Sequence, residues 1–276
     1  MGKLLLGNKE ITPILLSTGI PRQIVSGEYT FPNHDFSFEL PHNVTSLENY
    51  VMSYAFRGCT KVKSVDFSSV QVAGAAALYY AFYGCTGLTG LLDFSSLTTT
   101  NGSSLAYAFY GCTNITEVDF SSLSVASGTN TLGYTFRGCT KLESISFPSL
   151  TRIGTNSSTA NYGQLAYLLY GCTKITELRF PELTEVYCTG GSTVAYGTFS
   201  YNNYIQKLYF PKLATINYGS GASSANRVAV TNLFANCSAL TEIHFAEENQ
   251  AAIEASPGYS TAWGRGASNV TIYFDL

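Results

Sequence analysis

The 276-residue sequence is poor in charge. Asp, Glu, Lys and Arg make up 12% of it, against about a quarter in an average soluble domain, and leave a net charge of −3. The few basic residues form no block, so the composition argues against nucleic acid as a partner. Ser, Thr, Gly, Asn and Tyr supply the polar groups instead.

Long apolar runs are also missing. None approaches the roughly 18 residues that span a bilayer, so we expect no membrane insertion. Near the N-terminus, apolar residues 4–6 are followed by Lys9 and Glu10, and this run is too short for a secretory signal peptide. Gly7 and Asn8 predict a hairpin there instead. We therefore expect no secretion signal, and the location stays open, with a cell surface or a virion favoured over a membrane.

Signatures of catalysis are absent as well. The three histidines, His34, His42 and His244, lie far apart, and no GxSxG, HExxH or phosphate-binding loop occurs. The seven cysteines form no CxxC pair and have no histidine at zinc spacing. The sequence therefore predicts no enzyme, no cofactor and no metal centre.

What the chain does contain is a repeated motif close to AFxGCT. Its copies stand at residues 55–60, 81–86, 108–113, 135–140 and 168–173. Two altered copies end at Asn203 and Ser238. A fixed motif with a period of about 20 to 50 residues predicts a stacked repeat architecture. Such solenoids bind through their surfaces and need no catalytic chemistry.

A phenylalanine follows each motif, eight residues after the cysteine position or nine in the second copy. The residues before it alternate polar and apolar, as in a half-buried strand. With one further phenylalanine added at each end, these residues, here called the marker phenylalanines, predict nine stacked parallel strands. They are Phe38, Phe67, Phe94, Phe120, Phe147, Phe180, Phe210, Phe245 and Phe274. The additional residue at Gly90 and Leu91 predicts a bulge.

The segment before each motif predicts one short helical turn, because a leucine and a phenylalanine, such as Leu78 and Phe82, stand four residues apart. The motif glycine would end that turn in the left-handed conformation. The motif cysteines should fill a tight buried corner and form a ladder. They are Cys59, Cys85, Cys112, Cys139 and Cys172. We expect Cys112→Ser to bury a hydroxyl without a partner.

These residues resemble the leucine-rich repeats of the BspA-like class. The class has a repeat close to IGxxAFxGCxxLxxIxIPxxV, which residues 136–150 and 152–154 match, and the resemblance covers about residues 36–276. It implies a leucine-rich-repeat solenoid, an α/β repeat with a parallel β-sheet on the concave face and short helices or turns on the convex face. Such proteins commonly lie at surfaces and bind proteins, host components or polysaccharides.

The repeats divide the chain into an N-terminal cap with a short hairpin, residues 1–35, and a solenoid, residues 36–276. The last strand, at about 270–275, would act as the C-terminal cap. Residues 3–13 also resemble the start of small proteins from phage and prophage tail regions. One hypothesis is a non-enzymatic recognition scaffold for a protein or glycan ligand at a bacterial or host surface. The alternative is a virion-associated structural protein that self-associates, which leaves a homo-oligomer open.

Candidate ligand-binding residues lie on the outward side of the predicted strands. Three aspartates should stack there, as a site for a cation or basic ligand or as a solvated acidic stripe. They are Asp66, Asp93 and Asp119. The same column continues through Ser146, Arg179, Tyr209 and His244. Its character therefore changes from acidic to mixed along the solenoid.

Tyrosine-rich loops are the second set of candidates. Loops at 155–163, 187–196 and 217–227 are rich in Tyr, Ser, Gly and Asn, as antibody paratopes are. Their candidate contacts are Tyr162, Tyr187 and Tyr218. Loops of this composition can equally be soluble spacers. We expect the contact surface between residues 155 and 227.

Two columns of tyrosines accompany the motifs. The first should be a packed spine, and its members are Tyr54, Tyr80, Tyr107, Tyr134, Tyr167 and Tyr196. The second, expected to be more exposed, holds Tyr83, Tyr110 and Tyr170, with Arg57 and Arg137 in the same repeat position.

Overall fold

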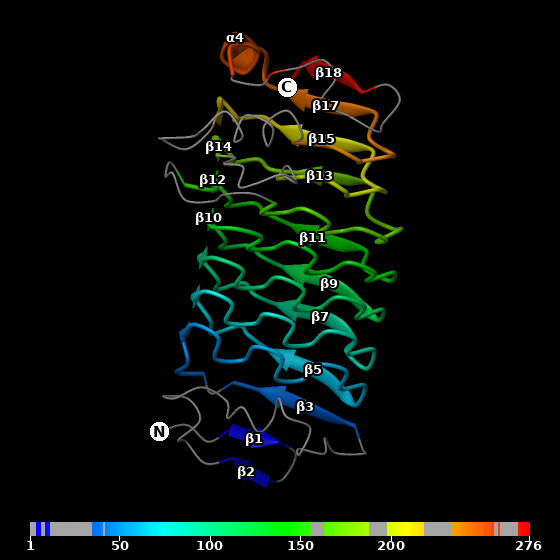
Figure 1. Ribbon diagram of the computed structural model, residues 1–276. Helices are drawn as coiled ribbons and strands as arrows, with labels where there is room; N and C mark the ends of the chain where they lie inside the picture. The colour runs from blue at the N-terminus through cyan, green and yellow to red at the C-terminus, as the bar shows by residue number, and fades with distance from the viewer. Residues whose placement is uncertain are drawn as a thin grey trace.

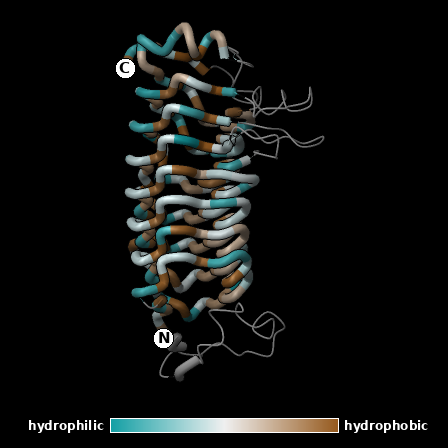
Figure 2. Tube along the Cα trace, turned by 90° about the vertical axis from the view of Figure 1, so that its left-hand side faces the viewer, coloured by the Kyte–Doolittle hydropathy of each residue, from teal (hydrophilic) through white to brown (hydrophobic). Residues whose placement is uncertain are grey.

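The computed structural model describes residues 4–6, 9–11, 35–40, 42–155, 163–187, 198–217, 233–256, 259 and 270–276. These residues form a solenoid whose turns, here called rungs, stack into a nearly straight column (Figure 1, Figure 2). The predicted hairpin is present at its N-terminal end, where β1 (Leu4–Leu6) pairs with β2 (Lys9–Ile11) in antiparallel fashion. The rest of the predicted cap, apart from Asp35, lies outside the described residues.

The main sheet contains nine parallel strands in the described part of the chain. They are β3 (Phe36–Glu39), β5 (Val62–Asp66), β7 (Gly90–Asp93), β9 (Ile115–Asp119), β11 (Ser144–Ser146), β13 (Glu177–Arg179), β15 (Lys207–Phe210), β17 (Glu242–Phe245) and β18 (Thr271–Phe274). Backbone pairing joins the first five into a lower block and the last four into an upper block. No pairing joins β11 to β13, although both strands are described, and we call this boundary the seam.

A second parallel sheet was not predicted. Seven short strands of the described residues form it: β4 (Ser46–Leu47), β6 (Val72–Ala73), β8 (Thr99–Thr100), β10 (Val125–Ala126), β12 (Arg152–Ile153), β14 (Glu185–Tyr187) and β16 (Thr215–Asn217). Most have two residues, too few to show an alternating pattern, so the sequence placed them in variable loops. This sheet runs without a break past the seam, since β12 pairs with β14.

The C-terminal end carries the 3₁₀ helix η2 (Glu247–Asn249) and the short helix α4 (Gln250–Glu254), which lies at the top of the column in Figure 1. In α4, the side chain of Ile253 is fully buried. No helix in the described residues is long and apolar enough to cross a membrane.

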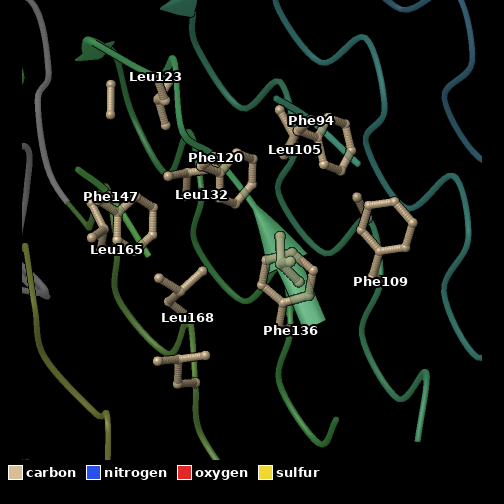
Figure 3. Packing of buried hydrophobic residues seen from close by; sticks show 14 of the residues in the cluster. Phe94, Leu105, Phe109, Phe120, Leu123, Leu132, Phe136, Phe147, Leu165 and Leu168 are labelled. Carbon is tan, nitrogen blue, oxygen red and sulfur yellow. The ribbon is translucent and has the colours of Figure 1, made fainter. Parts of the chain in front are cut away.

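Phenylalanines fill the core behind the main sheet, as predicted. The marker rings from Phe67 to Phe245 are buried, and successive rings stack along the column (Figure 3). Phe147 and Phe180 stack at 5.5 Å, so the core is continuous across the seam although the sheet is not. Phe274, in the last rung, is half-buried.

The register corrects the first marker and confirms the bulge. Phe38 pairs with Val65, not Phe67, so Leu40 takes the marker position in the first rung. The first repeat is therefore shorter than the phenylalanine spacing suggested. In β7, the register shifts between Gly90 and Leu91, where the sequence predicted a bulge, and Gly90 has a φ of +73°.

The predicted helical turns are wrong. The segment before each motif is a run of overlapping β-turns, here called the turn spine. The N–H of Ala55 donates to the carbonyl of Met52, three residues back, but the N–H of Phe56 donates to Ala81 in the next rung, at 2.7 Å. Tyr54 has a φ of +61°, which interrupts a right-handed helix. The motif glycines are left-handed as predicted, with Gly84 at +72°.

The motif cysteines are buried, as predicted, and Cys237 joins them. Burial raises the pKa of Cys112 to about 12. However, the described thiols from Cys85 onward each have a partner: the Sγ of Cys112, for example, donates to the carbonyl oxygen of Phe82 at 3.1 Å. A serine there would find the same acceptor, so the expectation of an unpartnered hydroxyl is wrong. Cys188 lies outside the described residues.

The altered sixth motif has a structural reason. The N–H groups of Leu169 and Gly171 would be expected to donate to carbonyls of the next rung. They donate instead to the side-chain oxygens of Asn202 and Asn203, at 2.8 and 2.9 Å. The Asn202 amide group also donates to the carbonyls of Phe199 and Leu165. The two asparagines therefore continue the hydrogen bonding between rungs.

Candidate recognition surface

The predicted strand candidates form an outward column in each block of the main sheet, and no backbone pairing joins the two columns across the seam. The paired register runs through Glu39, Asp66, Asp93, Asp119 and Ser146 in the lower block. In the upper block it runs through Arg179, Tyr209, His244 and Tyr273. Glu39 and Tyr273 were missed, although Tyr273 precedes the marker Phe274 just as His244 precedes Phe245.

The aspartates of the lower block cap turns. Each accepts the backbone N–H of the serine two residues later: Ser68 donates to Asp66 at 2.8 Å, and Ser95 and Ser121 donate to their aspartates at 2.9 and 2.7 Å. This is the Asx-turn geometry. Burial alone would raise the pKa of Asp66, but the hydrogen bonds from Ser68 outweigh it and lower the pKa. No group of three potential metal ligands occurs in the described residues.

Prolines remove this capping role further up the column. The residue two positions after Ser146, Arg179 and Tyr209 is Pro148, Pro181 and Pro211. A proline has no N–H to donate, so an aspartate at the column position would have no turn to cap. The change from D-F-S to x-F-P was visible in the sequence and predicts where the column changes its role.

The upper column is a stack of planar groups. The guanidinium carbon of Arg179 lies 3.6 Å from the ring centroid of Tyr209. The rings of Tyr209 and His244 stack at 4.7 Å, and those of His244 and Tyr273 also at 4.7 Å. Stacking of this kind stabilises each ring contact by about 0.5–1.5 kcal/mol. The side chain of Arg179 is 61% exposed and that of His244 only 11%, so the stack has an open lower end and a covered centre.

Ion pairs border this stack. Glu177 contacts Arg179 at 3.1 Å, and Lys207 contacts Glu242 at 2.9 Å. Hydrogen bonds from Lys207 and then His244 lower the pKa of Glu242. The two imidazole nitrogens of His244 lie 3.1 Å from Glu242 and 2.8 Å from Asp275. A protonated imidazole can donate to both carboxylates. These contacts hold the planar groups in one arrangement.

The loop candidates do not join this column in the described residues. Tyr187 ends β14 of the second sheet and is half-buried, and its carbonyl accepts a hydrogen bond from Gln164 at 3.4 Å. Tyr162 and Tyr218 lie outside the described residues, as do residues 156–162, 188–197 and 218–232.

The turn spine carries the first tyrosine column. Its rings stack at centroid distances of 4.1–5.2 Å through Tyr54, Tyr80, Tyr107, Tyr134, Tyr167 and Tyr201. Tyr201 holds the sixth place, and the predicted Tyr196 lies outside the described residues. Burial, together with neighbouring tyrosines, raises the pKa of Tyr79 and Tyr80 to about 12.

The second column combines arginines and tyrosines beside the first. It runs through Arg57, Tyr83, Tyr110, Arg137 and Tyr170. The guanidinium of Arg57 lies 5.2 Å from the ring of Tyr83, and that of Arg137 lies 4.6 Å from the ring of Tyr170. The described rings of both columns are half-buried, and Arg57 is exposed.

The repeats match a known family. The model of the BspA type leucine-rich repeat region, with six copies, matches residues 26–163 and 133–248. These matches cover more than half of the chain. The chain belongs to the BspA-type leucine-rich repeat family. The resemblance found in the sequence is thereby confirmed.

Solved structures with similar repeats share little sequence with this BspA-type chain. A leucine-rich repeat protein from Bacteroides ovatus is 18% identical, with a TM-score of 0.37, over 87% of this chain and 60% of that one. A leucine-rich cell surface protein from Faecalibacterium prausnitzii is 14% identical, with a TM-score of 0.22, over 89% of this chain and 80% of that one. This chain therefore spans less than two thirds of the Bacteroides protein. No curated protein matches the sequence.

Membership of the BspA-type family gives the general role. Leucine-rich repeat solenoids of this family are in general non-enzymatic scaffolds that bind other molecules, mostly proteins, through their repeats. The described surface carries two ordered arrays of side chains: the outward column of the upper block and the pair of columns on the turn spine.

Proposed function

We propose that the protein is a recognition scaffold that binds a protein ligand at a bacterial or host surface through the upper block of the main sheet. One observation carries the proposal. The aspartates of the lower block cap turns, but Arg179 and Tyr209 have a proline two residues later and no turn to cap, and they stack on each other. Side chains without a turn to cap are available for contacts.

The chemistry of the stack favours a protein over a glycan. The faces of Tyr209 and His244 are covered on both sides, so their ring edges, and the guanidinium group of Arg179, are what this part of the stack presents to solvent. A sugar usually packs on an open ring face. Tyrosine and arginine are the residues most enriched at energetic centres of protein interfaces. Ion pairs such as Lys207–Glu242 would add a polar rim of both signs.

The loop candidates belong to the same proposal. Residues 155–163, 187–196 and 217–227 each begin at or just after the end of a strand of the second sheet in the sequence, and we propose that Tyr162, Tyr187 and Tyr218 extend the contact. The three aspartates Asp66, Asp93 and Asp119 are not part of it, because their carboxylates are engaged by turns.

Arrays of extracellular proteins and of neutral glycans, probed with the purified chain, test the proposal. We expect hits on the protein array that Arg179→Ala/Tyr209→Ala weakens at least about tenfold. The matched control is Leu91→Ala/Glu117→Ala, which removes one large and one charged side chain from the same face of the lower block. We expect this control variant to bind the same array proteins as the unmodified chain.

Three outcomes contradict the proposal: hits on neutral glycans alone, hits that both double variants weaken equally, and hits that neither changes. Sedimentation of the unliganded chain measures its mass and tests the self-association hypothesis separately. A stable closed oligomer whose interface covers Arg179 and Tyr209 would also contradict recognition through this face.

A further inference from the structure

We propose that the turn spine of the first five rungs is a second binding surface, separate from the main sheet, for a linear anionic polysaccharide. We call it the basic face. It consists of the two columns described above, together with Lys61 and Lys141, which follow the motif in the first and fourth rungs.

Charge is segregated on this face. The spine segments 48–61, 74–87, 101–114, 128–141 and 163–174 contain one acidic residue, Glu48, at the start of the first segment. They contain five basic residues: Arg57, Lys61, Arg137, Lys141 and Lys174. Of these, Lys174 pairs with Glu143, whereas neither arginine has a carboxylate partner in the described residues. A chain with a net charge of −3 therefore collects positive charge on one side.

The two arginines are aligned and held in place. Arg57 and Arg137 occupy the same column, three rungs apart, which is about 14 Å at the usual strand spacing. Arg137 is flanked on both sides, at 5.4 Å from the ring of Tyr110 and 4.6 Å from that of Tyr170. A guanidinium plane fixed by ring contacts loses less freedom when it binds an anion.

The tyrosine column is built at a conformational cost. Its six tyrosines have φ between +56° and +63°, a region that bulky side chains rarely occupy. Asparagine adopts this conformation more readily, and Asn236 does so in the seventh rung at +59°. Stacking offsets the strain, and the result is a row of phenol edges along the axis. Strain of this kind concentrates at binding surfaces.

The regularity of the face indicates a polymer. The tyrosines of the first column recur on every rung of this face and the arginines on the first and fourth, which suits an extended ligand whose own charged groups repeat. Each ring face of the tyrosine column is covered by its neighbours, so nucleobases could not stack on it as they do on single-strand binding proteins. Guanidinium groups bind carboxylate or sulfate in bidentate fashion.

Binding to immobilised polymers at about 50 mM salt tests the inference, because surface charge is weakly screened there. The probes are heparin, polygalacturonate, dextran and oligo-dT. We expect binding to heparin, polygalacturonate or both, and none to dextran. Arg57→Gln/Arg137→Gln should weaken it about tenfold. The control Lys63→Gln/Lys212→Gln removes the same charge elsewhere and should weaken it less than about twofold.

The inference is overturned if neither polyanion binds, if the two double variants weaken binding equally, or if oligo-dT binds as tightly as the polysaccharides. Circular dichroism melting checks that each variant is folded. If Arg57→Gln/Arg137→Gln melts early, Arg57→Lys/Arg137→Lys keeps the charge and should retain most of the binding. Arg179→Ala/Tyr209→Ala should leave polyanion binding unchanged, so this experiment tests the basic face independently of the upper block.

Discussion

The lower and upper blocks of the main sheet share one core but differ on their outer face. Behind the sheet, Phe120 and Phe210 are both fully buried among stacked rings. In front, the lower column caps turns with aspartates and the upper column stacks Arg179 on Tyr209. The difference shows that a repeat position has no fixed role. A serine two places later supplies the N–H that Asp66, Asp93 and Asp119 accept, and the prolines after Arg179 and Tyr209 supply none.

The largest expected effect tests the shared core. Phe120→Ala and Phe210→Ala should each lower the free energy of unfolding by about 3–5 kcal/mol, because each leaves a cavity among stacked rings. Urea unfolding of the two variants measures it. A loss in one block that is less than half that in the other would show that the cores are not equivalent.

The next effect tests the capping role. Asp93→Ala should cost about 1 kcal/mol, because the N–H of Ser95 loses its acceptor, while Asp93→Asn should cost less since its amide oxygen can still accept. Arg179→Ala, at the same column position above the seam, should stay within about 0.5 kcal/mol. If Asp93→Ala and Arg179→Ala lowered the free energy of unfolding equally, the column position would not differ in role between the two blocks.

The smallest expected effect tests the buried motif cysteines, whose thiols donate to a backbone carbonyl of the preceding rung. Cys112→Ser and Cys237→Ser should each cost about 1 kcal/mol or less, because a hydroxyl can donate to the carbonyl that now accepts from the thiol. Thiol titration of the native protein at pH 8 should detect neither cysteine, since burial raises the pKa of both to about 12. Fast reaction of either thiol would contradict this burial.

Sequence reasoning found the features that repeat and missed those that are short. The phenylalanine spacing predicted the main sheet and its inward rings, because a strand of four or five residues shows an alternating pattern. The second sheet was not predicted because strands such as Val72–Ala73 are too short to show an alternating pattern. The helical turn was wrong because the Leu78–Phe82 spacing also fits a turn spine, where Tyr80 is left-handed with φ +56°.

The candidate column was predicted from position alone, and its two roles were not. The marker residues placed Arg179, Tyr209 and His244 in one line, and the register confirms that line. That Arg179 stacks on Tyr209 depends on side-chain orientation, which spacing does not contain. The loop tyrosines Tyr162 and Tyr218 stay predictions, since they lie outside the described residues.

The sequence by itself determined that the chain is a repeat solenoid, where its inward rings lie and where the outer column changes from acidic to mixed. These properties follow from spacing, because neighbouring rungs place equal repeat positions side by side. Tertiary structure alone decided the turn spine, the seam between β11 and β13 and the use of Asn202 and Asn203 as acceptors. Each depends on which N–H meets which oxygen in the next rung, and that geometry exists only once the rungs are stacked.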